Sequence, residues 1–462
     1  MRRTAKNVLN CIPLNCVDKC LLALDSINEP MLIHVILDLE GEIDHARLEQ
    51  SIFAAQEAYP VMRTTLRSGH FRFFREIQEN FGRRVLSVPD LAQLQSTSYE
   101  GYISSWMNKP LDIRKEFPVR VLLLQKDERE SSLFFTFHHS AADGLRALLF
   151  VREVIEHYNN ELSWESKSCG DIRINRKGDE LLEFANSQRS KVEHYYRKMI
   201  FSLFHRFVIS VFPFPTRVFH DKSGQSRKLH FYSKTIGRGE FEQIQSKTMS
   251  AGVGLNDIFL AACYRTVEKW NNMHGKASKK IRIMAPANIS PKGFRYVVSN
   301  QASWFSLPTM PKHRKDPAKL LQKVRTDTIN ATRNRIAFSL VYFFYFCSRF
   351  PLFVMRWMGR FLMITRTYVD TILITNIGFI WPRPGSEEPA VSSLGNAKIL
   401  NVNGSAPVVT PMGLSIAAGI YNRNLNFSLT YRHALFSEEK ARMFLDLYVE
   451  ELRNYQVASG GS

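Results

Sequence analysis

The chain has 462 residues, 45% of them hydrophobic and 12% aromatic, which predicts two packed domains or lobes and excludes global disorder. Its 62 basic and 43 acidic residues give a formal net charge of +19. This balance favours an anionic partner, such as nucleic acid, a membrane surface or coenzyme A. The basic residues are scattered, without zinc-finger spacing, an RNP-like segment or a lysine-rich tail, so we expect no nucleic-acid partner.

Six cysteines in a chain of this length do not predict a disulfide framework. Cys11, Cys16 and Cys20 lie close together, but they lack Cys-x-x-Cys spacing and an accompanying histidine cluster, so we expect free thiols. No apolar segment of signal-peptide length follows the basic residues near the N-terminus. We therefore expect a cytoplasmic protein, with peripheral attachment to the inner membrane surface as an open alternative.

The first part of the chain alternates strand and helix patterns. The predicted elements are a strand at 31–40, a helix at 44–57, strands at 61–66 and 71–77, a helix at 99–107, a hairpin at 118–138 and a helix from 145 to about 158. The charged turn of the hairpin is KDERES, and its second strand leads directly into a polar segment.

That polar segment stands at the end of a buried strand pattern, Leu133 to Phe137. His138 and His139 come first, then three small residues, then Asp143 and Gly144 at the start of the next helix. Because adjacent strand residues point to opposite faces, only one histidine can face a given cavity. The other must find a hydrogen-bond partner inside the protein. This arrangement predicts an active centre at the edge of a core.

The polar composition of residues 162–178 marks a boundary. We expect an N-terminal lobe at 1–162, a linker and crossover helix at 163–227, and a C-terminal lobe at 228–462. The predicted elements of the second lobe are helices at 239–250 and 256–271, strands at 281–286, 303–307 and 368–380, helical segments between 317 and 365, and a strand-turn-strand-helix unit at 412–452. Residues 430–433 align with residues 136–139, which indicates a pseudo-repeat of two α/β lobes.

The pattern His-His-x-x-x-Asp-Gly at 138–144 resembles the signature of the chloramphenicol acetyltransferase-like, or condensation-domain-like, acyltransferase superfamily. Segments at 255–270, 297–309 and 372–380 resemble, in order, blocks of its wax ester synthase/diacylglycerol acyltransferase branch. The resemblance implies an α/β fold of two lobes, each with a mixed sheet, and an active-site channel between them. It also implies that His139 is the catalytic base and that no metal or bound cofactor is needed.

Asp143 has three interpretations. The resemblance implies an ion pair with Arg63, which matches the arginine of the superfamily's Pro-x-x-Arg-Thr segment. The aspartate could also cap the following helix or orient His139. Gly144 would let the backbone approach a ligand or a tight turn. A metal site formed by His138, His139 and Asp143 is disfavoured because the two histidines diverge.

Weaker candidates lie in the second half of the chain. Asn256 either caps a helix or contributes to the acyl-donor channel. Asn376 and Gly378 would shape the site, and Ser405 or Thr410 would offer a hydroxyl to an oxyanion. His433 lacks a following Asp-Gly and is expected to be structural.

Two aromatic and basic stretches, 196–221 and 336–366, allow two interpretations. They are either core helices or elements that dock on an anionic membrane. Arg349, Arg356 and Arg360 interrupt the second stretch, which leaves no uncharged run long enough to span a bilayer.

The function that we predict is acyl transfer from a thioester, with acyl-coenzyme A as the expected donor, to a hydroxyl or amine acceptor. A hydroxyl acceptor is favoured. His139 would act as general base without a covalent acyl-enzyme. Two alternatives remain: condensation with a phosphopantetheinyl thioester on a carrier protein, and a non-catalytic lipid-binding or assembly protein on the same scaffold.

Overall fold

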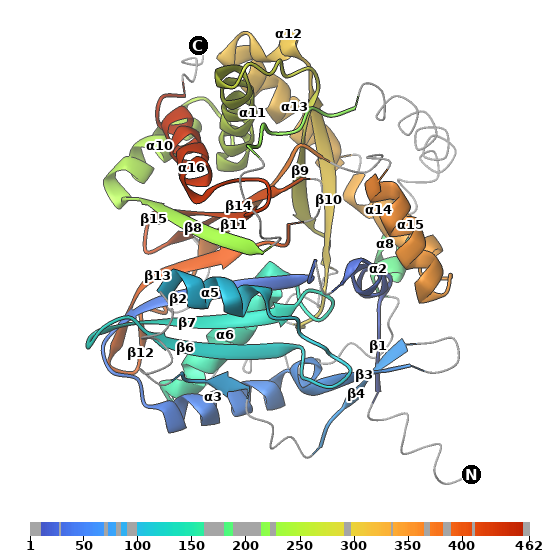
Figure 1. The fold of residues 1–462 in the computed structure, drawn as a ribbon, viewed down its shortest axis with the longest axis vertical. Helices are drawn as coiled ribbons and strands as arrows, with labels where there is room; N and C mark the ends of the chain where they lie inside the picture. Colours follow the sequence, from blue (N-terminus) through green and yellow to red (C-terminus); the bar gives the residue numbers. More distant parts are fainter. Residues whose placement is uncertain are drawn as a thin grey trace.

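Two six-stranded sheets, one in each lobe, organise the protein (Figure 1). The computed structural model describes residues 11–26, 29–68, 73–79, 85–89, 99–160, 180–187, 214–221, 228–290, 297–333, 336–364, 370–381, 390–408 and 412–455. Both sheets contain parallel and antiparallel pairs. The predicted α/β fold with a mixed sheet in each of two lobes is therefore confirmed.

The sheet of the first lobe has the order β12-β13-β2-β7-β6-β5. Its strands are β2 (Leu32–Glu40), β5 (Leu86–Ser87), β6 (Val119–Gln125), β7 (Glu130–His138), β12 (Ser393–Leu394) and β13 (Ala397–Ser405). Phe135 and Phe137 of β7 share a core with residues of α3 (His45–Ala58) and α6 (Gly144–Tyr158). Phe134, which points to the opposite face, packs with Trp106 of α5 (Tyr99–Asn108). Because both faces are covered, residues 133–137 of this strand are apolar on both faces apart from Thr136.

The sheet of the second lobe has the order β10-β9-β11-β14-β15-β8. Its strands are β8 (Leu229–Ile236), β9 (Ile281–Asn288), β10 (Ala302–Thr309), β11 (Ile372–Ile380), β14 (Leu414–Tyr421) and β15 (Asn424–Arg432). Its core includes residues of four helices: α10 (Arg238–Ser250), α11 (Leu255–Met273), α13 (Pro317–Arg333) and α16 (Glu438–Arg453). A short helix, α12 (Pro311–Arg314), follows β10.

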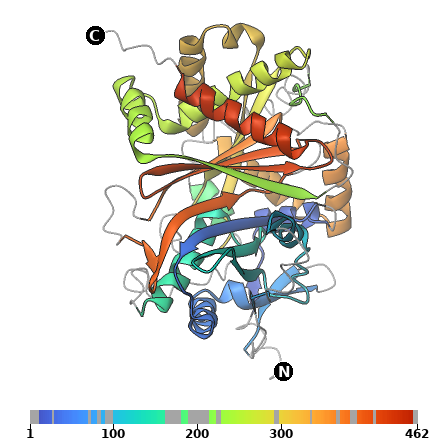
Figure 2. The ribbon, with the colours of Figure 1, turned by 60° about the vertical axis from the view of Figure 1, so that its left-hand side comes forward.

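One strand pair crosses from the second part of the chain into the first sheet. β13 pairs antiparallel with β2, from Lys398 opposite Glu40 to Ser405 opposite His34. Figure 2 shows the orange-red β13 beside the blue β2. The C-terminal segment therefore supplies two strands to the sheet that carries β7. Most of the segment 163–227, predicted as a linker and crossover helix, lies outside the described residues.

The two lobes repeat one strand arrangement. β7 lies between β2 and β6, and β15 lies between β8 and β14. The backbone N–H of His139 donates to the carbonyl of Met31, immediately before β2, and the N–H of His433 donates to the carbonyl of Lys228, immediately before β8. The predicted alignment of 430–433 with 136–139 is therefore correct in three dimensions.

The N-terminal residues form elements that the sequence patterns do not predict. β1 (Cys11–Pro13) joins β3 (Thr64–Ser68) and β4 (Phe73–Ile77) in a small third sheet, and the predicted strand at 61–66 begins instead as a short 3₁₀ helix, η1 (Pro60–Arg63). α2 (Cys16–Leu24) starts with a capping box between Asn15 and Asp18. This helix packs beside α8 (Glu180–Ser187), α14 (Ile336–Cys347) and α15 (Leu352–Ile364).

Candidate active site

His139 is the first residue after β7, in the turn that leads to α6. Its Nδ1 lies 3.1 Å from the carbonyl oxygen of Ala142. A carbonyl oxygen only accepts, so the tautomer that fits carries its proton on Nδ1 and leaves a lone pair on Nε2. The local turn therefore prepares Nε2 to accept a proton.

Asn300 reaches His139 from the segment before β10. Its Nδ2 donates to the backbone carbonyl of His139 at 2.6 Å and lies 3.1 Å from Nδ1. In the Nδ1–H tautomer both of these nitrogens are donors, so the amide proton goes to the carbonyl. The carbonyl of Asn300 in turn accepts from Nδ2 of Asn15, at 2.9 Å. Asn300 thus joins three segments: the residues before α2, the residues before β10, and the turn that carries His139.

Burial lowers the pKa of His139, because a charged imidazole is poorly solvated inside the protein. The hydrogen bond to the Ala142 carbonyl and the nearby Asp143 carboxylate oppose this shift without cancelling it. The ring is therefore neutral at neutral pH, which is the state that a general base requires.

His138 faces away from His139 and is 1% exposed. Its Nδ1 accepts from the backbone N–H of Ser140 at 3.2 Å and lies 2.8 Å from the Ser140 hydroxyl oxygen. Its Nε2 lies 3.5 Å from a carboxylate oxygen of Asp25. These contacts place the Nε2 proton toward Asp25 and fix the turn from inside, so the two histidines point to different sides.

Asp143 caps α6 and ties it to the second half of the chain. One carboxylate oxygen accepts from the backbone N–H of Arg146 at 3.1 Å, and the other accepts from that of Gln301 at 2.8 Å. Nη1 of Arg146 lies 3.6 Å from Oδ1 of Asp143, which makes the two side chains an ion pair. Among the described residues, the ion pair of this carboxylate is with Arg146 and not with Arg63, so the expected pairing is corrected. The physical reason is local, because Arg146 lies one helical turn after the cap.

Arg75 of β4 supports the turn between β7 and α6, residues 139–143, which we call the histidine turn. Its guanidinium is buried, donates to the carboxylate of Asp18 at 3.0 Å and also donates to the backbone carbonyl of Ser140. Arg63, in η1, is half-buried. Sequence reasoning missed Arg75, because an arginine in a strand pattern such as FFREI carries no local sign of a distant partner.

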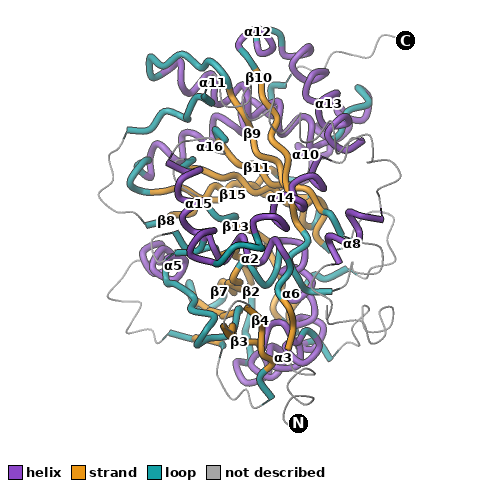
Figure 3. Tube along the Cα trace, turned by 90° about the vertical axis from the view of Figure 1, so that its right-hand side faces the viewer, coloured by secondary structure: helices purple, strands orange, loops and turns teal. Residues whose placement is uncertain are grey.

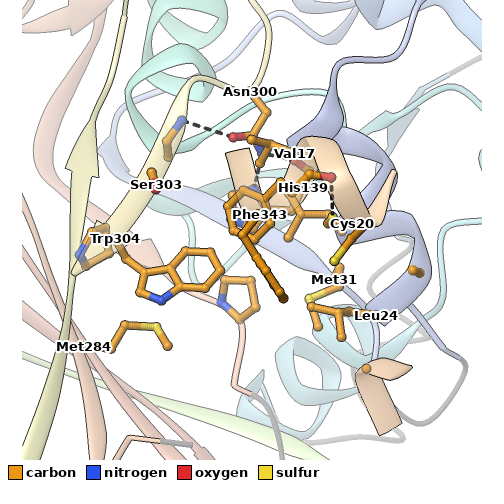
Figure 4. Close-up of a pocket in the computed structure, with 18 of the residues that line it drawn as sticks. Val17, Cys20, Leu24, Met31, His139, Met284, Asn300, Ser303, Trp304 and Phe343 are labelled. Carbon is orange, nitrogen blue, oxygen red and sulfur yellow. Dashed lines mark hydrogen bonds between the residues drawn. The ribbon is translucent and has the colours of Figure 1, made fainter. Parts of the chain in front are cut away.

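A cavity of about 240 Å³ opens beside His139 (Figure 4). Both lobes contribute to its wall: Met31 and the α2 residues Cys20 and Leu24 lie on one side, and Met284, Asn300 and Trp304 lie on the other. Phe343 of α14 and Met355 of α15 complete it. The wall is almost entirely apolar, with His139, Asn300 and Ser303 as its main polar members. Such a site suits an apolar ligand that reacts at one polar end.

The weaker candidates do not line this cavity among the described residues. Asn256 lies in the first turn of α11, where the Asp257 carboxylate accepts from the Gly254 N–H. Asn376 accepts from the N–H of Gly378 across a bulge in β11. The Ser405 hydroxyl bonds to that of Thr430 at 2.8 Å. Thr410 lies outside the described residues.

In the described part of the chain, no group of three or more histidine, cysteine or acidic side chains is arranged to hold a metal ion. All five described cysteines are free thiols. None of the described helices is both long enough and apolar enough to cross a bilayer.

Two α/β lobes that share a cavity, with a His-His-x-x-x-Asp-Gly turn in its wall, define a chloramphenicol acetyltransferase-like fold. More particularly, the chain belongs to the condensation domain family, whose model matches residues 23–277. A plipastatin synthase from Bacillus subtilis (strain 168) is 23% identical over 152 residues. This match covers 29% of the present chain and only 4% of the synthase.

Solved structures share the fold at low identity. The first condensation domain of the CDA synthetase is 13% identical, with a TM-score of 0.65 and coverage of 98% of this chain and 97% of that one. The starter condensation domain of rhizomide synthetase, solved as a single-residue mutant in complex with C8-CoA, is 12% identical, with a TM-score of 0.64 and the same coverage of 98% and 97%.

Proposed function

We propose that this chain transfers an acyl group from a phosphopantetheinyl thioester to a hydroxyl or amine acceptor, with His139 as the general base. The carrying observation is the fixed ring of His139: Nδ1 is held by the Ala142 carbonyl, while the residue lines the apolar cavity. Membership of the condensation domain family supports this class of reaction.

In the proposed reaction, Nε2 of His139 takes the proton of the acceptor O–H or N–H as that atom attacks the thioester carbonyl carbon. A tetrahedral intermediate forms, then the carbon–sulfur bond breaks and the thiolate leaves. The imidazolium returns the proton to sulfur. The Ala142 carbonyl and the Asp143 carboxylate favour the charged ring during this step. The ester or amide and a free thiol are the products.

The relatives support two kinds of donor. We propose an acyl or aminoacyl group on a carrier protein as the first donor, supported by membership of the condensation domain family and by similarity to the plipastatin synthase. The rhizomide synthetase domain was solved in complex with C8-CoA, so we take an acyl-coenzyme A thioester as the second candidate donor for this chain. Both donors place the same reacting group at His139, so we retain both, with acyl-coenzyme A as the alternative.

The cavity wall informs the size and polarity of what binds. Trp304, Phe343 and Met355 would contact an aliphatic or aromatic chain of the ligand. Removal of that chain's apolar surface from water would favour its binding. A volume of about 240 Å³ exceeds the roughly 150 Å³ cavity that holds a benzene ring in another protein. We therefore propose that an apolar acyl or acceptor chain occupies this space. Asn256, Asn376, Gly378 and Ser405 have no part in the proposed proton transfer.

The test is acceptor-dependent release of thiol from two donor series. The purified chain is mixed with acyl-coenzyme A of increasing chain length, or with the same acyl groups on a phosphopantetheinylated carrier protein, together with alcohols and amines. Free thiol and the ester or amide product are measured together. Equal amounts of both products, lost in His139→Ala, are the expected result. Binding of the donors without turnover by any acceptor would overturn the proposal in favour of a binding protein.

A further inference from the structure

The helix pair α14–α15 is apolar on two opposite sides. On the inner side Phe343, Phe344 and Cys347 of α14 and Met355 and Met358 of α15 line the His139 cavity. The outer side carries a second set of apolar residues, and these are exposed. A helix that is apolar all round is normally buried or embedded in lipid. The outer side is therefore suited to contact with something outside the described chain.

The outer side is an aromatic surface. Phe353, Trp357 and Phe361 are 73%, 65% and 52% exposed, and their spacing of four residues places them in one stripe along α15. Phe346 and Phe350 continue it across the turn from α14, with ring centroids 5.3 Å apart. Figure 3 shows both helices on the side of the molecule that faces the viewer. We call these five residues the aromatic face.

This concentration is unusual for the molecule. Five of the twelve large apolar side chains that are exposed among the described residues lie between Phe346 and Phe361. Single exposed apolar residues need no explanation, but a contiguous patch marks an interaction site.

The charges within the segment that carries the aromatic face have one sign. Between Asp327 and Asp370 the sequence contains six arginines and no acidic residue. Arg349 and Arg360 are exposed within the patch or at its edge. Arg349 is held by Tyr345, whose hydroxyl lies 3.1 Å from its guanidinium and whose ring lies beneath it. Both arginines are therefore available to a polyanionic surface.

These observations favour a bilayer over a second copy of the chain. In a symmetric dimer the same patch would face itself, so its arginines would lie against one another without acidic residues to balance them. Tryptophan and phenylalanine beside arginine are instead suited to the headgroup region of an anionic membrane. Helices of 12 and 13 residues are too short to cross the bilayer and would lie in its plane.

We propose that the aromatic face of α14–α15 docks the protein on an anionic lipid bilayer. α15 packs closely on α2, because a Cβ atom at Gly359 would lie only 2.9 Å from Cδ2 of Leu24. Since Leu24 also lines the His139 cavity, this contact connects the aromatic face to the site. Docking would hold one wall of the His139 cavity against the membrane. Docking would depend on the partition of these side chains into lipid, and it does not require the proposed acyl transfer.

The experiment is co-sedimentation of the full chain with vesicles of phosphatidylcholine alone or with phosphatidylserine, across a salt series. Binding to the anionic vesicles at low salt is expected, with a smaller component that persists at high salt. In vesicles of brominated phosphatidylcholine with phosphatidylserine, quenching of tryptophan fluorescence should be weaker for Trp357→Phe than for the unchanged protein. The chain contains six tryptophans, so this variant identifies the one that inserts.

Two pairs of substitutions separate apolar insertion from charge. Arg349→Gln with Arg360→Gln should weaken binding at low salt about 25-fold, since each basic group near an anionic surface contributes about fivefold. Phe353→Ser with Trp357→Ser should remove the salt-resistant component. The matched controls are Lys279→Gln with Lys312→Gln, and Met249→Ser with Met273→Ser, which alter exposed residues of other elements. Both controls should bind like the unchanged protein, and thermal unfolding checks that every variant is folded.

Three results would overturn the proposal. One is no binding to anionic vesicles at low salt. Another is binding that the four α14–α15 substitutions leave unchanged, which would place the contact on a different surface. The third is concentration-dependent dimerisation in analytical ultracentrifugation that Phe353→Ser with Trp357→Ser abolishes, because a second copy would then cover this face. None of these outcomes depends on whether acyl transfer is detected.

Discussion

The side-chain amide of Asn300 donates to the backbone carbonyl of His139 across 161 positions of sequence. This bond joins the β7–α6 turn of the first lobe to the segment that precedes β10 of the second. His139, the proposed base, is therefore positioned by both halves of the chain. Closure of the two lobes on each other is part of what forms the site.

Replacing His139 with alanine should lower turnover by about a hundred- to ten-thousand-fold, the usual contribution of a general base. The variant should unfold at the same temperature as the unchanged protein, since the ring lines a cavity wall. His433→Ala at the equivalent position of the second lobe is the control and should retain activity. Near-normal turnover by His139→Ala would remove the residue from the mechanism.

The contact between Asp143 and Arg146 should appear as coupling in a double-mutant cycle. Loss of one member of a buried ion pair costs roughly 3–5 kcal/mol, because the other charge is left buried. Asp143→Ala and Arg146→Ala should therefore each destabilise the protein, with a strongly non-additive double mutant. Denaturant unfolding measures the four free energies.

A parallel cycle tests the corrected pairing. Asp143→Ala with Arg63→Ala should be additive to within about 0.5 kcal/mol, as for residues without a shared contact. Coupling of Asp143 with Arg63 that exceeds its coupling with Arg146 would contradict the pairing in the structure.

Asn300 should act as a positioning residue. Asn300→Ala removes the donor to the His139 carbonyl and is expected to lower kcat by up to about a hundredfold through misplacement of the ring. Asn300→Asp would place a carboxylate near Nδ1 and raise the pKa of His139. The acid limb of its pH–rate profile should therefore move to higher pH. A purely structural role would lower the activity of both variants without moving that limb.

The pH dependence of the unchanged protein follows from the lowered pKa of His139. Since burial favours the neutral ring, the base form persists below the ordinary histidine pKa of about 6.5. The ratio kcat/KM should stay constant through neutral pH and fall only in more acidic solution. A profile whose acid limb lies above pH 6.5 would show that the ring is not desolvated in the free protein.

His34 should make the fold sensitive to acid. It is 3% exposed, lies 3.0 Å from the Thr136 hydroxyl, and burial lowers its pKa to about 3. Because the unfolded state takes up the proton first, the free energy of unfolding should fall by about 1.4 kcal/mol per pH unit below pH 6.5 from this group. Urea titrations of His34→Asn between pH 6.5 and 4 should show a shallower slope, whereas His45→Asn at an exposed position should not.

Local patterns were sufficient for much of this fold. The strand at Leu133 to Phe137 was predictable because a strand buried on both faces has a short run of consecutive apolar residues. The helix after Asp143 was predictable because its apolar residues recur with the 3.6-residue helical period. The aspartate's capping role was also readable from its place at the helix start.

Contacts between distant segments were not predictable in the same way. Arg75, which is paired with Asp18, and Asn300 contact the turn at His139 and Ser140 from separate segments, and no spacing rule relates these residues. The motif predicts an ion pair of Asp143 with Arg63, whereas in the structure Asp143 pairs with Arg146, one helical turn further along the chain. The crossing of β13 to β2 also depends on tertiary packing, because an apolar strand pattern does not specify which sheet it joins.

The crossing of β13 constrains how this protein can be divided. Residues 397–405 complete a sheet whose other long strands come from residues 32–138, so a fragment that ends after the first lobe would expose the backbone of β2 from His34 to Glu40. An open edge of that length is prone to aggregation. Chimeras that exchange one half for that of a relative would also exchange this strand, so its register against β2 must be preserved. A cut intended to yield two independent fragments would therefore have to keep residues 393–405 with the first.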